Sequence, residues 1–369
     1  MMTTVTEPKA TPPVTFKGLL TPEEIRHYRY PVLWRAVVDM SLVWVQILAA
    51  VGLYVGWPNP LSFVTALVLI AGGQHGLYLV AHEFAHFAVL PRHRRLNDFF
   101  GTWFFAAPIG MPLKLFRFRH FTHHRLYSTV DDTKDTYRRD IHGYRLWLEM
   151  VKSLTAYDYL RHGFRVLEHS RQPSNRRQGV LPRGSLLPLV VAQLVLLGAF
   201  WTINPWLYLG LWILPLVTLT EMFGKIRALM EHQPRDCQSG AAPGSGYFRD
   251  TPGPFVRSVK ANWFERLFLS KINFGYHAEH HLWPQLSYQY LPRVHRRLLE
   301  RGAFDDPRLG NEKTYLSTIR HLSQHEPPQQ SASSIASIHA ADDAVEATDD
   351  AVKPNRPASQ CADTPVAGD

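Results

Sequence analysis

Histidine is concentrated in three short segments of the chain, at spacings that suit metal binding. Residues three and four apart lie on one face of a helix, so each segment can direct two or three imidazoles at one point. Imidazole suits iron, copper, zinc and nickel, whereas calcium and magnesium prefer oxygen ligands. The segments HEFAH, HFTHH and HAEHH supply the candidate metal ligands His82, His86, His120, His123, His124, His277, His280 and His281.

The number of clustered histidines indicates two metal ions. Eight imidazoles exceed the three or four protein ligands of a mononuclear zinc site, so a dinuclear centre accounts for them better. Ten histidines that stand outside the clusters are interpreted as packing or interfacial residues. They are His27, His75, His93, His142, His162, His169, His295, His321, His325 and His339.

Four apolar runs have about the ~20 residues needed to cross a ~30 Å hydrocarbon layer. They are residues 36–55, 61–81, 185–203 and 205–223, joined in pairs by uncharged turns. A shorter run, 99–113, contains Pro108 and Pro112, which favours an interfacial or re-entrant segment. The predicted fold is an all-α integral membrane protein. It has four transmembrane helices in two hairpins, and a cytoplasmic helical cap holds a histidine-ligated dimetal site.

Lys and Arg residues flank the outer ends of the two hairpins, whereas the turn within each hairpin contains no Lys or Arg. The positive-inside rule therefore places both termini, the large polar segments and all three histidine clusters in the cytoplasm. In a bacterium this would be the inner membrane. The net charge of +9 is then a collar facing the membrane surface, not a nucleic-acid site.

Composition divides the chain into four parts. Residues 1–35 are a polar cytoplasmic leader without the pattern of a signal peptide, and 36–300 form the membrane domain. Residues 301–327 are a cytoplasmic extension, and 328–369 are low in aromatic and bulky apolar residues, which predicts a disordered tail. Two cysteines, Cys237 and Cys361, are too few for a disulfide framework or a thiolate metal site.

The sequence around the clusters resembles the membrane fatty acid desaturases and hydroxylases, which carry three histidine boxes. HEFAHFAVLPRHRRLNDFFG looks like the first box, FRFRHFTHHRLYSTVDDTKD like the second, and INFGYHAEHHLWP like the third. The resemblance covers roughly residues 16–299, with boxes and spans in the family's order. His277 stands where front-end members have glutamine, and no HPGG-type haem motif is present, so a fused electron carrier is not expected.

This resemblance implies a non-haem di-iron centre with dioxygen as co-substrate and electrons from a ferredoxin-like or small haem protein. It also implies a ninth ligand before the third box, where RALMEHQ contains His232. Desaturation of an aliphatic substrate is the first expectation. Hydroxylation is the alternative, because ligand motifs do not report small differences in substrate placement. The substrate would be a fatty acyl chain, a lipid-like molecule or a small metabolite, since similar members include one that desaturates dihydrorhizobitoxine.

Polar residues near the clusters are candidates for orienting the ligands. Carboxylates commonly accept the second N–H of a ligating imidazole. The candidates are Glu83, Asp131, Asp132, Asp135, Glu231 and Glu279, with Asn273 as a further residue that either polarises a metal-bound water or caps a helix. Arg117 and Arg119 would either hold an anionic substrate group or belong to the basic collar.

Three other classes of protein compete with this interpretation. HEFAH also fits H-E-x-x-H, the motif of zinc metalloproteases, but an intramembrane protease would leave six clustered histidines unused. A soluble di-iron bundle would need several buried glutamates on paired helices, which the sequence lacks. A metal transporter would carry its ligands along the spans, and the spans contain few polar residues.

Overall fold

The computed structural model describes residues 18–127, 132–133, 141, 143–171, 186–232, 255–306 and 309–324. The chain divides into a unit Met1–Glu326 and a second unit Pro327–Asp369, and the predicted tail lies outside the described residues, as do Asp131 and Asp135. The described part is mostly helical, as predicted. It also contains one small parallel sheet that the sequence did not predict, formed by β1 (Val256–Val259) and β2 (Leu309–Glu312).

The first predicted hairpin consists of α2 (Leu33–Gly56) and α3 (Pro60–Ala85). The side chain of Asn59 caps α3 by accepting from the amide of Ser62 at 3.0 Å, and Pro60 suits the first helical position. With 26 residues, α3 is about 39 Å long, which exceeds the ~30 Å hydrocarbon layer. Its last turn can therefore carry His82 beyond the membrane.

The second apolar pair differs from the predicted lengths. The run 185–203 forms α9 (Leu187–Trp201), whose 15 residues are short for a full span. The run 205–223 belongs to a longer helix, Tyr208–His232, made of η3 (Tyr208–Ile213), η4 (Leu216–Thr220) and α10 (Glu221–His232). In the described part three helices are long and apolar enough to cross a membrane, or four if one bent pair counts as a span. The predicted set of four spans therefore stays a prediction.

The helix Tyr208–His232 is irregular around Pro215, where η3 and η4 are π-helical. Proline removes one backbone donor and disturbs the helical ladder. Gln74 of α3 donates to the carbonyl oxygen of Trp212 at 2.8 Å, and the Thr220 hydroxyl donates to Gln74 Oε1 at 2.9 Å. These bonds satisfy polar groups where lipid would offer them no partner.

The proline-containing run 99–113 lies within a bent helix pair. Arg94–Ile109, made of α4 (Arg94–Phe100), η1 (Gly101–Ala106) and η2 (Ala107–Ile109), meets α5 (Leu113–Leu126) at 92°. The turn uses Gly110, whose φ of +71° suits glycine. Such a bend occurs in a re-entrant loop or in a broken span, so the expected interfacial or re-entrant segment stays a prediction. The bend also directs α5, with the second histidine box, back across the end of α3.

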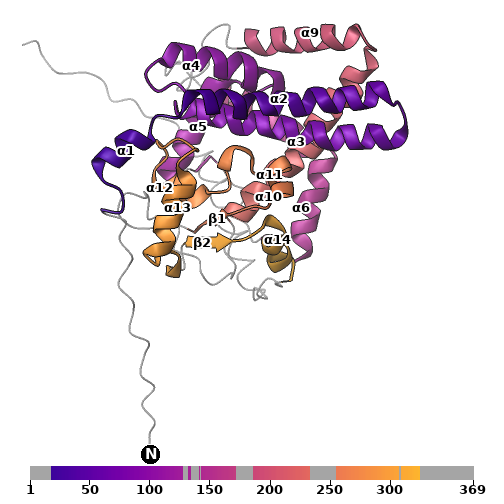
Figure 1. Ribbon diagram of the computed structural model, residues 1–369. Helices are drawn as coiled ribbons and strands as arrows, with labels where there is room; N and C mark the ends of the chain where they lie inside the picture. Colours follow the sequence, from indigo (N-terminus) through magenta and orange to yellow (C-terminus); the bar gives the residue numbers. More distant parts are fainter. Residues whose placement is uncertain are drawn as a thin grey trace, which may run out of the picture. The chain divides into compact units, whose positions relative to one another are not determined.

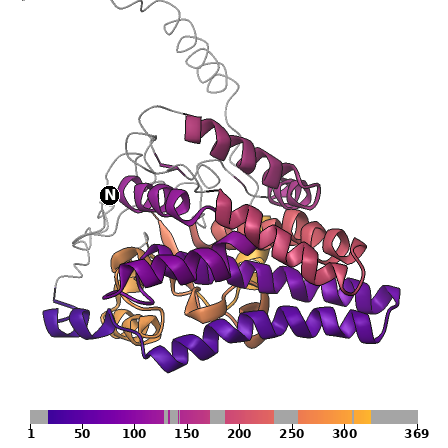
Figure 2. The same ribbon diagram turned by 90° about the horizontal axis from the view of Figure 1, so that it is seen from above.

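Most of the remaining elements lie below the α2–α3 hairpin in the view of Figure 1 and are partly covered by it in the view from above (Figure 2). α10 and α12 contact β1, and α11 contacts α3. The remaining elements are α1 (Pro22–Tyr28), α6 (Tyr144–Leu154), α7 (Tyr157–Arg171), α11 (Trp263–Phe268), η5 (Lys271–Asn273), α12 (His277–Leu282), α13 (Leu291–Glu300), η6 (Ala303–Asp305) and α14 (Tyr315–Gln324).

Candidate metal centre

Four helices bring the histidine boxes together. The last turn of α3 and the residue that caps it carry the first box, α5 carries the second, and α12 carries the third. α10 ends at His232, so this predicted ninth ligand joins the others. All nine predicted ligands fall into groups whose side-chain nitrogens lie close enough to hold metal ions.

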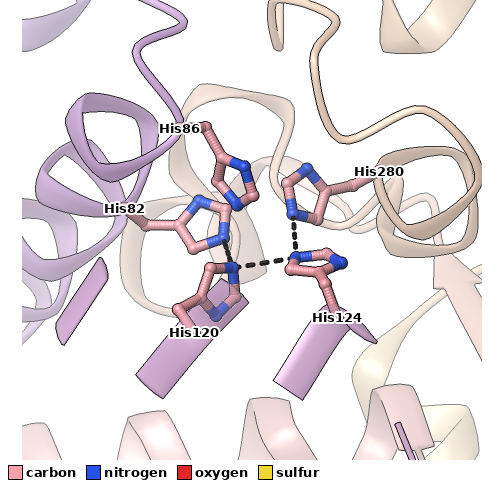
Figure 3. A group of neighbouring side chains, drawn as sticks. All are labelled: His82, His86, His120, His124 and His280. Carbon is pink, nitrogen blue, oxygen red and sulfur yellow. Dashed lines mark hydrogen bonds between the residues drawn. The ribbon is translucent and has the colours of Figure 1, made fainter. Parts of the chain in front are cut away.

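The first group draws on all three boxes (Figure 3). Its ligand nitrogens lie within 4.8 Å of one another. The Nε2 atom of His120 is 2.7 Å from that of His82 and 2.9 Å from that of His124. The Nε2 atoms of His124 and His280 are 3.1 Å apart. The members of this group are His82, His86, His120, His124 and His280.

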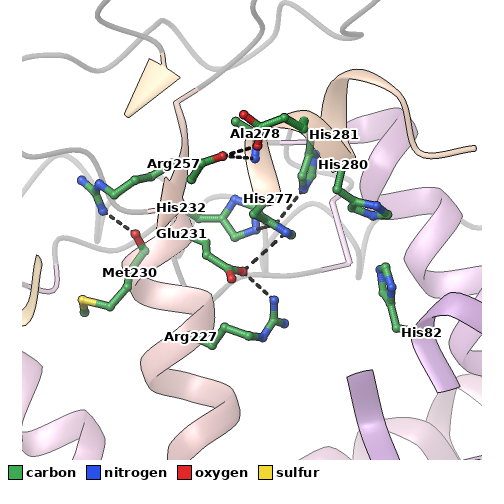
Figure 4. Close-up of polar contacts among 12 residues, drawn as sticks. His82, Arg227, Met230, Glu231, His232, Arg257, His277, Ala278, His280 and His281 are labelled. Carbon is green, nitrogen blue, oxygen red and sulfur yellow. Dashed lines mark hydrogen bonds and ion pairs between the residues drawn. The ribbon is translucent and has the colours of Figure 1, made fainter. Parts of the chain in front are cut away.

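Two further groups share His232: one contains His123 and His281, and the other contains His277 and Glu231. Their four histidines lie next to the first group and are called the second group below (Figure 4). The Nε2 atom of His277 is 3.0 Å from those of both His232 and His281. His123 belongs to the same cluster, with its nitrogen within 4.8 Å of those of His232 and His281. The rings of His124 and His281, one from each group, have centroids 4.5 Å apart. The two groups are therefore immediate neighbours.

The spacing of these nitrogens fits a coordination sphere. For a metal–nitrogen bond of ~2.1 Å, neighbouring ligand atoms are about 3.0 Å apart in an octahedron and about 3.4 Å apart in a tetrahedron. The closest Nε2 contacts, from 2.7 to 3.1 Å, are close to such edges. Burial, followed by the neighbouring imidazoles, lowers the pKa of His124 and of His277 well below its usual value. Both imidazoles are thus neutral, which is the form that binds a metal.

Carboxylates lie behind three of these imidazoles. Asp132 is 2.9 Å from Nδ1 of His123, and Glu83 is 3.3 Å from Nδ1 of His82. Glu231 is 3.5 Å from Nδ1 of His277. In each case the carboxylate faces the nitrogen opposite the one that joins the cluster, so it can fix the ring's orientation. Three of the predicted orienting residues therefore lie beside imidazoles of the cluster, and their role stays a prediction.

Two other candidates are placed elsewhere. Glu279 is fully buried, but its carboxylate accepts from the Ser258 hydroxyl at 2.5 Å and lies 2.7 Å from Nδ1 of His295. Ser258 Oγ also accepts from the amide of Ala278, so Glu279 connects α12 to β1 and α13. Asn273 donates to the carbonyl oxygen of Tyr288 at 3.4 Å.

Several contacts at the site were not predicted from the sequence. Arg227 donates to Glu231 at 2.5 Å, and the Tyr315 hydroxyl donates to the same carboxylate at 3.0 Å. The hydroxyl of Tyr127 lies 2.8 Å from Nδ1 of His232 and donates to the carbonyl oxygen of Phe255. Arg227 precedes Glu231 by four residues on one helix, a spacing that could have indicated the pair. Nothing local in the sequence points to the two tyrosines.

A cavity of about 430 Å³ reaches the first histidine group at His120. Tyr78, Leu115 and Phe116 line it near the cluster, and other apolar lining residues come from η2 and η4. Farther along the wall, Lys225 forms ion pairs with Glu149 at 3.0 Å and with Asp158. The volume lies in the ~300–1,000 Å³ range of small-molecule sites.

The two arginines beside the second box differ in position. Arg117 pairs with Asp98 at 2.5 Å and lies over the ring of Phe87, so it has a structural role. Arg119 lines the cavity and donates to the carbonyl oxygen of Thr133 at 3.4 Å. Of the two, Arg119 alone lines this cavity.

Comparison with known proteins agrees with the geometry. The chain matches the family described as fatty acid desaturase over residues 57–309, which is more than half of its length and includes all nine histidines. An 85-residue stretch is 27% identical to a beta-carotene 4-ketolase from Protosiphon botryoides, covering 23% of this chain and 21% of that protein. The chain thus spans about a fifth of the length of this relative. The protein is an oxidoreductase that belongs to the fatty acid desaturase family.

Proposed function

We propose that this protein is an oxygen-dependent desaturase that introduces a C=C bond into a fatty acyl, lipid-like or small-metabolite substrate. The observation that carries the proposal is the convergence of nine imidazoles in two adjacent groups, beside a cavity that reaches one of them. The overall reaction converts an alkane segment, one O₂, two protons and two electrons into an alkene and two molecules of water.

An unactivated C–H bond is too strong for side-chain acids or bases, so the protein must hold an oxidising cofactor. Two iron ions bound by the nine histidines would supply that oxidising power. The protein's own groups hold and orient the ligands: Asp132 and Glu83 accept from the Nδ1 atoms of His123 and His82, and Glu231 lies 3.5 Å from Nδ1 of His277. The apolar residues of the cavity wall would position an alkyl segment near His120 and keep water away.

Hydroxylation of an alkyl carbon is the second candidate. The similarity to a beta-carotene 4-ketolase supports it, because that protein's name describes the introduction of oxygen into its substrate. Hydroxylation would use the same site and consume one O₂, two protons and two electrons to give an alcohol and one water. The two reactions differ in whether the product loses two hydrogens or gains one oxygen.

The geometry of Glu83 speaks against a zinc metalloprotease. In an H-E-x-x-H protease the glutamate acts as a base on the water held by the metal. Here the Glu83 carboxylate contacts Nδ1 of His82, while Nε2 of His82 faces His120. Glu83 is therefore behind its neighbouring imidazole and does not line the cavity described above.

The electron donor and the orientation belong to the same proposal. Two electrons per turnover would come from a ferredoxin-like or small haem protein that docks on the cytoplasmic face. The positive-inside pattern supports a cytoplasmic site and cytoplasmic termini. Labelling of single cysteines at exposed positions in intact cells would test this orientation.

Metal analysis and product analysis together test the function. The purified protein should contain two irons per chain and produce, only with oxygen and a reductant, a lipid or metabolite that lacks two hydrogens. His123→Ala should lose iron and product, whereas His93→Ala, at an exposed helix cap, should keep both. A single zinc, or turnover without oxygen, would refute the proposal, and a product with one added oxygen would select the hydroxylase.

A further inference from the structure

Two consecutive helices outside the long apolar spans each expose a row of apolar residues, which together are called the α6–α7 stripe. On α6 it consists of Tyr144, Trp147, Leu148, Val151 and Leu154, which are between 43% and 65% exposed. Their spacing of three and four residues places them on one face. On α7 the stripe continues with Tyr157, Leu160 and Phe164, which are 52%, 58% and 71% exposed. Contiguous apolar surface of this kind marks a contact with another apolar phase.

The opposite face of α6 is packed against the protein. Leu146 and Met150 are buried in a cluster with Leu229 of α10 and Leu322 of α14. Ser153 donates to Asp158, which together with Glu149 pairs with Lys225. The Lys225 side chain is only 9% exposed, so the charges of this region are compensated inside the protein.

The contacts of α6 with the third long helix, Tyr208–His232, indicate how deep α6 would lie in a membrane. α6 contacts η4, the segment Leu216–Thr220. Thr220 lies 12 residues, or about 18 Å, from the start of the helix at Tyr208. A hydrocarbon layer ~30 Å thick that begins near Tyr208 would still surround this segment. Figure 1 also shows α6 running across the direction of α2 and α3, as a helix in the plane of a leaflet would.

α11 gives independent support at the same depth. Its Phe268 packs so closely on α3 that a Cβ at Gly72 would lie 2.7 Å from the Phe268 ring. Gly72 is 12 residues, or about 18 Å, from Pro60, where α3 begins. At this level α11 exposes Trp263 by 79% and Phe264 by 56%. Two separate elements thus present apolar surface where the spans would be surrounded by lipid.

We propose that the α6–α7 stripe and the exposed aromatic residues of α11 are inserted in the membrane leaflet on the side of the metal centre. α6 would then be an in-plane membrane element, and both α6 and α7 would contact lipid instead of forming part of a water-exposed cap. Arg145 and Lys152 flank the stripe and can extend to the lipid headgroups. The partner is a lipid surface, and anionic headgroups would favour it.

The same placement decides where the cavity opens. Arg161, His162 and Gly163 of α7 line the cavity, and the last two are exposed. They adjoin Leu160 and Phe164 of the stripe. An opening of the cavity at these two exposed residues would face the leaflet, so that molecules dissolved in lipid could reach His120 directly. Only this consequence rests on the proposed function, because the insertion itself holds for any reaction.

Spin labels on single cysteines test the insertion. Cys237 and Cys361 are first replaced by serine, and a nitroxide is then attached to Leu148→Cys, Phe164→Cys, Trp263→Cys or Gly163→Cys. Leu42→Cys on α2, where Leu42 is 56% exposed, is the lipid control, and Arg301→Cys at the end of α13 is the aqueous control. Each protein is reconstituted in phosphatidylcholine–phosphatidylglycerol nanodiscs, and accessibility to oxygen and to a water-soluble nickel chelate is measured.

The proposal expects the labels at positions 148, 164 and 263 to behave like the one at position 42, with high oxygen and low nickel accessibility. Behaviour like that at position 301 would overturn the insertion. The label at Gly163 decides the opening separately: lipid-like accessibility supports a mouth in the leaflet, and water-like accessibility rejects it. Because these positions are exposed, the labels should leave the fold intact, which size-exclusion chromatography checks before each measurement. None of these readouts requires turnover, so they remain informative if the desaturase proposal fails.

Discussion

At the candidate metal centre, the imidazoles are placed to bind metal and the carboxylates are placed to orient the imidazoles. Nε2 atoms face one another across each histidine group, and carboxylates lie behind Nδ1 of His82, His123 and His277. Buried carboxylates cost free energy unless they are hydrogen-bonded. The N–H groups of His82 and His123 therefore stabilise the acids behind them, while the acids hold the two rings in place.

Asp132 is the orienting residue with the closest contact, and its removal should weaken metal binding. Asp132→Ala leaves the Nδ1–H of His123 without this carboxylate, so we expect a loss of about 10- to 100-fold in iron affinity. Iron retained during dialysis against graded chelator measures the change. Asp305→Asn, at an exposed position on η6, is the matched control. Equal iron retention in Asp132→Ala and the wild type would show that this carboxylate does not support the site.

Lys271 should make stability depend on pH in the alkaline range. Burial lowers the pKa of Lys271 from 10.5 to about 8, although its ammonium group donates to Gln46 at 2.5 Å. Between about pH 8 and 10.5 the folded protein has lost this proton while the unfolded chain still holds it. Stability therefore rises with pH across that window. The unfolding temperature of the wild type should rise relative to Lys271→Met from pH 8 to 10, and a constant difference would contradict this assignment.

Much of the site was predictable because its signals are local. Histidines three and four apart share a helix face whatever the rest of the chain does, and apolar runs near 20 residues mark spans. Distances between remote segments are not encoded in this way. The sequence offered three aspartates after the second box and did not favour Asp132, and Tyr315 reaches Glu231 from 84 residues away.

Helix packing explains why α3 is rich in glycine. A Cβ at Gly73 would lie 2.3 Å from Cγ1 of Ile47 on α2, and one at Gly76 would lie 2.5 Å from the Lys271 side chain. Small residues let helices approach closely in lipid, where burial of apolar surface offers little drive. Sequence analysis found the hairpin but not this contact, because glycine in an apolar run looks the same whether or not a partner helix lies beside it.

Substitution of Gly73 by alanine should show whether close packing or helix propensity has the larger effect on stability at this position. Gly73→Ala forces Ile47 to move, and overpacking of this kind costs about 1–3 kcal/mol. Gly52→Ala on α2 is the matched control, since within the described residues a Cβ there has no heavy atom within 4 Å. Alanine favours a helix over glycine by about 0.5–1 kcal/mol. Thermal unfolding in detergent should show Gly73→Ala less stable than the wild type and Gly52→Ala at least as stable; the reverse order would refute the close contact.

α6 shows how averaging over a long segment hides an element. Residues 114–183 look polar and basic as a whole, which led to the expectation of a cytoplasmic cap. Within them, YRLWLEMVKSL forms an amphipathic helix with one apolar face outward. Periodicity over eleven residues carries information that the composition of seventy does not.

Across the whole unit Met1–Glu326, the histidine groups connect elements that are remote in the sequence. The first group takes residues from α3, α5 and α12, and the second from α5, α10 and α12. A metal held by such a set stabilises the folded state by its binding free energy, because the unfolded chain offers no preformed site.

Removal of the metals should therefore loosen the whole unit. After exhaustive chelation we expect a lower unfolding temperature than for the iron-loaded protein, with recovery when iron(II) is added under anaerobic conditions. A variant that combines His120→Ala and His123→Ala is the control, since chelation should no longer change its unfolding temperature. If chelation left the unfolding temperature of the wild type unchanged, the imidazoles would not bind a metal that stabilises the fold.

α12 is only six residues long, yet it completes both histidine groups, with His280 in the first and His277 and His281 in the second. During synthesis the ribosome makes the other six histidines first, and neither group is whole until residue 281 has emerged. The long apolar helices α2, α3 and Tyr208–His232 are therefore synthesised before either group can be complete. A chain truncated before α12 would keep the long apolar helices but have two incomplete sets of imidazoles.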